Sequence, residues 1–102
     1  MSEELATIPA ARLAELIRGR EVSPVEAVEA YLRRVERLNP SLNAVVTLAP
    51  DAVEQARGAE RALTRGDAVG ALHGVPLTVK DTIEVRGLRA TAGSRVRAGR
   101  VA

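Results

Sequence analysis

The chain has 102 residues, 46% of them hydrophobic, but it carries one tyrosine and no phenylalanine or tryptophan, so any core consists of Val, Leu, Ile and Ala. Its formal net charge of +2 results from 15 basic and 13 acidic residues that are interspersed, a pattern that does not indicate a nucleic-acid groove. The absence of cysteine excludes disulfides, a thiol nucleophile and a cysteine-ligated zinc site, and a single histidine excludes a histidine-based metal cluster.

The N-terminal residues, Met1-Ser2-Glu3-Glu4, are acidic and are not followed by an uninterrupted apolar run. Such a start fits neither a signal peptide nor a membrane span. We therefore expect a cytoplasmic protein without membrane contact.

The first predicted helix runs from about Pro9 to Arg18. Its apolar residues recur at helical spacing on one face: Leu13, Leu16 and Ile17. Thr7 is placed to cap its start, and Gly19 is placed to end it.

A stronger start signal follows at Ser23-Pro24-Val25-Glu26. In such a capping box the serine and the glutamate each satisfy a free backbone donor, and proline is favoured at the first helical position. The signal predicts a long helix that ends at Asn39-Pro40. The residues that form its apolar stripe are Val25, Val28, Leu32, Val35 and Leu38.

The next stretch, Asn43 to Leu48, is short, rich in β-branched residues and bounded by prolines, which predicts a strand near residues 44–48. Asp51 then caps a third predicted helix, from about Ala52 to Thr64, which ends at Arg65-Gly66-Asp67. The inward face of this helix consists mainly of alanine, which favours close packing.

Residues 71–81, Ala-Leu-His-Gly-Val-Pro-Leu-Thr-Val-Lys-Asp, place the only lysine of the chain at the end of a short apolar strand. Pro76 cannot donate to a β-ladder and belongs at the start of that strand. Strand alternation then puts Val75, Leu77 and Val79 on one face and Thr78 and Lys80 on the other.

Lys80 is the candidate catalytic residue. Arginine side chains stay protonated in proteins, whereas a lysine that apolar neighbours desolvate can lose its proton near neutral pH and act as a base. The alternative reading of the same residues is a surface lysine that pairs with Asp81 or with a nearby glutamate.

The other polar candidates have simpler explanations. His73 has no evident partner carboxylate or second ligand, so we expect it to pack a turn, and we expect Asp81 to accept hydrogen bonds from backbone donors or an arginine. Among the serines, Ser23 is a helix cap, Ser41 lies in a turn and Ser94 lies in a loop. The sequence indicates no cofactor and no metal ligand.

The string Gly70 to Asp81, continued by Ile83, Gly87-Leu88 and Thr91-Ala92-Gly93-Ser94, resembles the N-terminal part of amidase signature enzymes. This family includes bacterial amidases and the A subunit of the glutamyl-tRNA(Gln) amidotransferase. The resemblance extends upstream through Ser23-Pro24-Val25-Glu26 and Leu38-Asn39-Pro40 and covers effectively the whole chain.

The resemblance implies an α/β fold in which a mixed sheet lies between helical layers. Residues 1–102 would be the N-terminal part of one amidase domain, with three helices followed by the first core strands. Residues 1–66 would be mainly helical, with the strand near 44–48, and residues 67–102 would begin the catalytic core.

The resemblance also implies hydrolysis of carboxylic amides by a Ser-cisSer-Lys triad in which Lys80 is the general base. Both serines lie downstream in such enzymes, so we expect the 102-residue chain to be inactive alone. The implied partners are a small-molecule amide substrate and either the missing C-terminal part or a self-associated oligomer. The alternatives are a non-catalytic helical interaction module and the N-terminal part of the A subunit of a tRNA-dependent amidotransferase.

Overall fold

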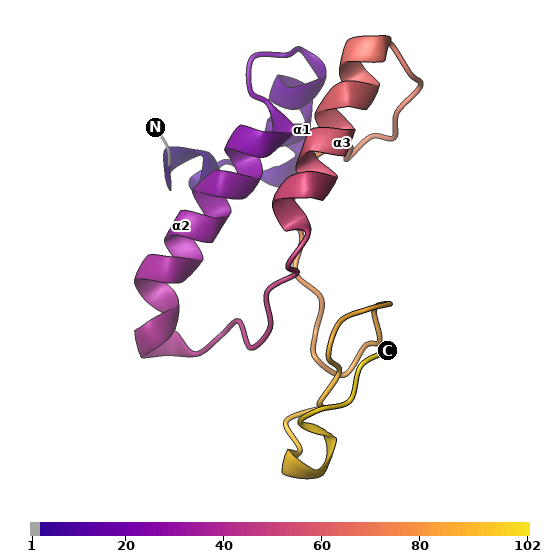
Figure 1. Cartoon of the computed structure of the whole chain (residues 1–102). Coiled ribbons are helices and arrows are strands. Elements are labelled where there is room, and N and C mark those ends of the chain that lie inside the picture. The colour runs from indigo at the N-terminus through magenta and orange to yellow at the C-terminus, as the bar shows by residue number, and fades with distance from the viewer. Residues whose placement is uncertain (1–2) are drawn as a thin grey trace.

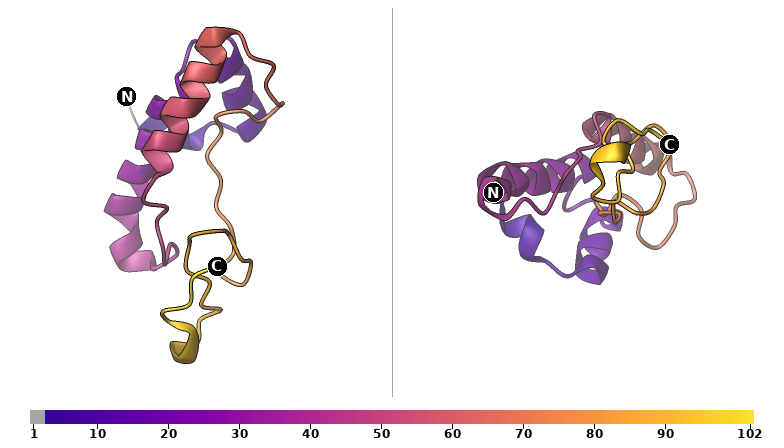
Figure 2. Two further views of the ribbon diagram at one scale, coloured as in Figure 1. Left: turned by 45° about the vertical axis from the view of Figure 1, so that its right-hand side comes forward. Right: turned by 90° about the horizontal axis from the view of Figure 1, so that it is seen from below.

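The computed structural model describes residues 3–102; Met1 and Ser2, which begin the acidic N-terminus, lie outside the described residues. The helical elements of the described part are η1 (Glu3–Thr7), α1 (Ala10–Arg18), α2 (Pro24–Leu42), α3 (Ala52–Arg65) and η2 (Arg95–Arg97), where η denotes a 3-10 helix. Figures 1 and 2 show α1, α2 and α3 gathered into one body, while the C-terminal part of the chain leaves them as a tail that ends in loops around η2. Among residues 3–102, none of the helices combines the length and the apolar composition that a membrane-spanning helix requires.

The core lies between α1 and the first half of α2. Leu13 and Ile17 of α1 are fully buried, and they belong to one apolar cluster with Ala27 and Ala30 of α2 and Leu5 of η1. Helix α2 also packs against η1 and α3. The predicted apolar face of the first helix is thus confirmed at Leu13 and Ile17.

The capping box at the start of α2 is confirmed in both directions. The backbone N–H of Glu26 donates to Ser23 Oγ at 3.0 Å, and the backbone N–H of Ser23 donates to Glu26 Oε1 at 3.0 Å. Gly19 and Gly66 end α1 and α3 as predicted, but the N-cap predicted at Thr7 is wrong, and Asp51 has the predicted position without a capping bond. Thr7 belongs to η1 and donates its hydroxyl to the carbonyl of Glu4, and the carboxylate of Asp51, although at the N-cap of α3, accepts no capping hydrogen bond.

Replacing Ser23 by alanine is expected to lower the free energy of unfolding by about 1 kcal/mol, since one N-cap hydrogen bond of α2 is lost. Thermal or urea unfolding followed by circular dichroism measures this change. Ser94→Ala is the matched control, because Ser94 precedes η2 without making a side-chain capping bond and its replacement should leave stability unchanged. Equal effects of the two substitutions would contradict the assigned role of Ser23.

The predicted end of α2 at Asn39-Pro40 is wrong, because the helix continues through Pro40 to Leu42. A proline inside a helix removes one backbone hydrogen bond, but here it lies in the last turn, which is secured from outside. The side chain of Asn39 both donates to and accepts from the backbone of Val45, each at 2.8 Å. Asn43, with φ 50°, ends the helix in the left-handed conformation and donates to the carbonyl of Asn39.

The predicted strands near 44–48 and at 75–80 are also wrong, since residues 3–102 contain no strand and only one isolated bridge, between Arg89 and Val101. A strand requires a hydrogen-bonded neighbour, and neither extended segment finds one in the described part. Because no sheet covers one side, the predicted alternation does not appear, and Leu77 and Thr78 are both exposed. Residues 3–102 therefore form a helical body followed by a tail, and the first core strands of the predicted α/β fold are not confirmed.

Candidate active site

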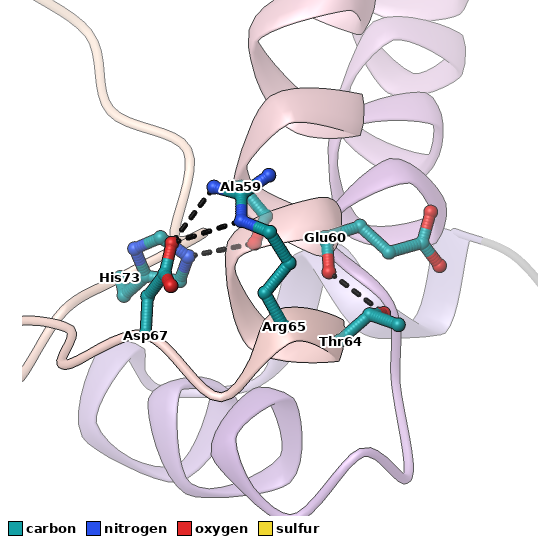
Figure 3. Close-up of polar contacts among 6 residues, drawn as sticks. All are labelled: Ala59, Glu60, Thr64, Arg65, Asp67 and His73. Carbon is teal, nitrogen blue, oxygen red and sulfur yellow. Dashed lines mark hydrogen bonds and ion pairs between the residues drawn. The ribbon is translucent and has the colours of Figure 1, made fainter.

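A turn over residues 71–74 seats the lysine-bearing segment on the helical body. The guanidinium of Arg18 in α1 donates to the carbonyl of Ala71 at 2.6 Å. His73 Nε2 lies 2.8 Å from the carbonyl oxygen of Ala59 in α3, which can only accept, so this ring nitrogen carries the hydrogen. Figure 3 shows His73 directed at α3, next to the ion pair between Arg65 and Asp67. The structural role predicted for His73 is confirmed.

Gly74 is the point at which the backbone of this turn passes close to α1 and the start of α2. It has φ +82°, and a Cβ added there would lie 3.0 Å from Pro24 Cγ and 3.1 Å from Ile17 Cγ2. Only glycine combines this backbone conformation with such an approach. The following residue, Val75, packs against the core, so the segment is fixed as far as Val75.

Lys80 lies beyond this fixed point, at the end of the extended segment that begins at Pro76. Its side chain is exposed, as are those of Leu77 and Val79. The carbonyl of Lys80 accepts the backbone N–H of Ile83 at 2.9 Å, which closes a turn immediately after the lysine. No apolar cluster of the described residues covers the amine, so its desolvation stays a prediction.

Asp81 closes a loop that begins next to Lys80. Its carboxylate accepts the backbone N–H of Thr91 at 3.1 Å and also the hydroxyl of Thr91, and its backbone carbonyl accepts the N–H of Ala92 at 3.3 Å. The hydrogen bonds from the side chain and then the backbone of Thr91 hold the pKa of Asp81 below its ordinary value of 3.8. The predicted role of Asp81 as an acceptor is confirmed, whereas Thr91 was not singled out from the sequence.

The contact between Asp81 and Thr91 is expected to persist from neutral pH down to about pH 4 and to be lost below it. A carboxyl whose folded pKa is lowered contributes stability above the unfolded value of 3.8, and this contribution disappears as the pH falls through the lower folded value. The Thr91 amide resonance, followed by NMR from pH 6 to pH 2, should shift with a midpoint under 3.8. Asp81→Asn should abolish the shift, and a midpoint at or above 3.8 would refute the assignment.

The serines of the described part have local roles or none. Ser23 caps α2, Ser41 donates to the carbonyl of Leu38 at 3.2 Å, and the hydroxyl of Ser94 makes no capping bond. Residues 3–102 hold no group of three or more His, Asp or Glu side chains that could bind a metal ion. The catalytic role of Lys80 stays a prediction.

A groove of about 590 Å³ lies apart from Lys80, between the second half of α2 and the segment that follows it. Its walls include Leu32 and Val35 on the helix and Leu48 on the segment, and Asn39 and Asn43 line its end. The sequence did not predict this groove, because it depends on how residues 43–48 fold back along α2.

The segment with Lys80 and the helices before it match a known protein family. The family model described as Amidase matches residues 26–102, which is most of the chain and includes Lys80, Asp81 and Thr91. The chain belongs to the amidase family. The match begins inside the capping box of α2 and continues to residue 102, so it includes nearly all of α2, all of α3 and the lysine-bearing segment.

The relatives that match the chain include an amidotransferase subunit and a hydrolase. It is 46% identical over 88 residues to the A subunit of the glutamyl-tRNA(Gln) amidotransferase of Methylococcus capsulatus, a match that covers 82% of this chain and 18% of that protein. It is 43% identical over 75 residues to the indoleacetamide hydrolase of Bradyrhizobium diazoefficiens, covering 72% of this chain and 14% of that protein.

A solved amidase confirms the family at the level of structure. A bacterial aryl acylamidase that belongs to the amidase signature enzymes superposes with a TM-score of 0.85 at 36% sequence identity. The match covers 93% of this chain and 20% of that protein. The chain thus spans one fifth or less of the length of the relatives it matches.

Proposed function

We propose that this chain is the N-terminal part of an amidase that hydrolyses the C–N bond of carboxylic amides through a Ser-cisSer-Lys triad. The observation that carries the proposal is the amidase family match across the segment with the only lysine. Lys80 is the general base, and the two serines belong to the part of the fold that the chain does not span. The substrate is a small-molecule amide.

The proposed chemistry begins with an uncharged Lys80 amine. It accepts the proton of the middle serine, which in turn accepts the proton of the nucleophilic serine. The serine oxygen attacks the amide carbonyl, the C–N bond breaks, and the proton passes back to the leaving amine. Water then releases the acid from the acyl-enzyme. Since Lys80 is exposed here, the remainder of the fold must supply the apolar cover that keeps the amine uncharged.

Two preparations test the proposal. In the first, residues 1–102 replace the matching fifth of the aryl acylamidase, and this grafted enzyme is assayed with an aryl acylamide. In the second, the 102-residue chain is assayed alone. We expect hydrolysis by the grafted enzyme and none by the chain alone, because the chain lacks both triad serines. Turnover by the chain alone that depends on Lys80, or a folded but inactive grafted enzyme, would refute the proposal.

A second candidate function is that of the A subunit of a tRNA-dependent amidotransferase, which the 46% identical relative favours. In such an enzyme the same Lys80 would release ammonia from an amide donor for transfer to a charged tRNA. To separate this function from amide hydrolysis, residues 1–102 are also grafted onto that relative, and the transfer of ammonia to the charged tRNA is measured. If only one of the two grafted enzymes is efficient, its activity identifies the function that residues 1–102 fit better.

A third candidate is a non-catalytic helical interaction module. It is favoured by exposed apolar side chains on the body and the tail, which are Leu42, Leu72, Leu77 and Ile83. Self-association of the purified chain, measured by analytical ultracentrifugation, would support this module or an oligomer. A monomer would leave the missing amidase part as the proposed partner.

A further inference from the structure

The two ends of the loop from Asp81 to Ala92, here called the loop root, are held together by hydrogen bonds that the side chain and the backbone carbonyl of Asp81 accept. The carboxylate of Asp81 holds the backbone and hydroxyl of Thr91, and the carbonyl of Asp81 accepts the N–H of Ala92. Lys80 stands directly before this root, and its own carbonyl is held by Ile83. Hydrogen bonds of the loop thus restrict the backbone on the C-terminal side of Lys80.

The loop root includes a backbone conformation that side chains disfavour. Ala92 has φ 52° and Gly93 has φ 72°, and the N–H of Ser94 donates to the carbonyl of Thr91 at 2.9 Å, which makes residues 91–94 a tight turn with two left-handed residues. Alanine rarely adopts this conformation, and such strain persists only where neighbouring contacts enforce it. At Ala92 the enforcing contacts are those that Asp81 makes with residues 91 and 92.

The outer end of the loop is closed independently of the root. The N–H of Ala90 donates to the carbonyl of Arg100, residues 87 and 88 pair with Ala102, and Arg100 forms an ion pair with Glu84 at 2.6 Å. None of these contacts touches Lys80 or Asp81. On the other side of Lys80, residues 77–79 make no hydrogen bond to another segment of residues 3–102. The contacts of Asp81 with Thr91 and Ala92, together with the turn from Lys80 to Ile83, therefore hold the backbone next to the lysine.

We propose that Asp81 and Thr91 are positioning residues of the amidase, which fix the direction in which the Lys80 side chain leaves the backbone. This role rests on the proposed function of Lys80 as general base. Neither residue touches the reacting atoms; each acts through the backbone of Lys80. A general base must lie within hydrogen-bonding reach of the proton that it accepts, so a loosened root lowers kcat while substrate binding is unchanged.

The first test uses the 102-residue chain and does not depend on activity. Thr91→Val keeps the shape of the side chain but removes its hydroxyl, and Thr91→Ser keeps the hydroxyl. In ¹⁵N relaxation measurements we expect order parameters of about 0.85 at residues 80–82 in the wild type and in Thr91→Ser, and values below about 0.6 in Thr91→Val. Unchanged order in Thr91→Val would overturn the proposal.

The second test uses the grafted enzyme described above. We expect Thr91→Val to lower kcat about 10-fold with KM unchanged, as for a misdirected base, and Thr91→Ser to restore at least a third of the wild-type rate. A purely structural defect would instead lower the folded fraction, which circular dichroism measures on the same samples. Wild-type kcat in Thr91→Val, or a loss explained by unfolding, would overturn the proposal. Failure of the proposed function is distinguished by Lys80→Ala, since an active Lys80→Ala enzyme refutes the base but not the order measured at residues 80–82.

Discussion

Replacing Lys80 by alanine in the grafted enzyme is expected to lower kcat by about 10²–10⁴-fold, the range that general acid–base catalysis contributes. The side chain is exposed in the chain itself and makes no contact that supports the helical body, so the substitution should leave folding intact. Steady-state hydrolysis of an aryl acylamide measures the loss, and circular dichroism checks that the variant remains folded.

Two further variants show whether proton acceptance is the property that matters. Lys80→Arg keeps a positive charge, but a guanidinium stays protonated in proteins and cannot accept a proton. It should be as inactive as Lys80→Ala. Arg86→Ala, which removes an exposed cation from the same loop, should keep full activity. Substantial activity in Lys80→Arg would mean that Lys80 acts through its charge and not as a base.

Gly74→Ala is expected to destabilise the chain by about 2–4 kcal/mol. The left-handed conformation at φ +82° costs a residue with a Cβ about 1–2 kcal/mol. The added methyl group would also approach Pro24 and Ile17 to 3.0 and 3.1 Å, and forcing one carbon into a packed site costs about 1–3 kcal/mol more. A smaller unfolded-state entropy offsets a part of this sum. Urea unfolding measures the change.

Gly66→Ala is the matched control for that experiment. Gly66 has φ +80°, nearly the value at Gly74, but a Cβ there would meet no atom within 4 Å. Its replacement should therefore show the backbone cost alone, and the difference between the two variants should report the close approach of the turn to α1 and α2. Equal destabilisation by the two substitutions would mean that residues 71–74 are not seated on the helices as described.

The helices could be predicted from the sequence because their determinants are local. Apolar spacing set the face of α1, the capping box set the start of α2, and Gly66 set the end of α3. The end of α2 at Pro40 was predicted wrongly because it depends on a contact outside the helix. A proline in the last turn is compatible with a helix when later residues secure that turn, and the bonds from Asn39 to Val45 depend on a chain reversal that no local pattern encodes.

The strands and the site were harder to predict because they depend on partners. Residues 44–48 and 75–80 have strand-like composition, but pairing needs a neighbouring strand, which residues 3–102 do not supply. Lys80 could be chosen since it is the only lysine, whereas its surroundings could not be read from its neighbours in sequence. Thr91 was missed because its link to Asp81 spans ten residues, and the only local signal was the glycine-containing turn that follows it.

The seating of the turn at Gly74 has a consequence for protein synthesis. Every residue of the buried cluster around Leu13 and Ile17, and the valine that packs on it, lies at or before position 75. Because these contacts need no residue after position 75, we expect that this body can close on the ribosome before the later part of an amidase has been translated. The exposed side chains of Leu77 and Val79 in the tail stay uncovered during that time. In a nascent amidase, this exposed apolar segment is where a chaperone that binds extended apolar segments would be needed first.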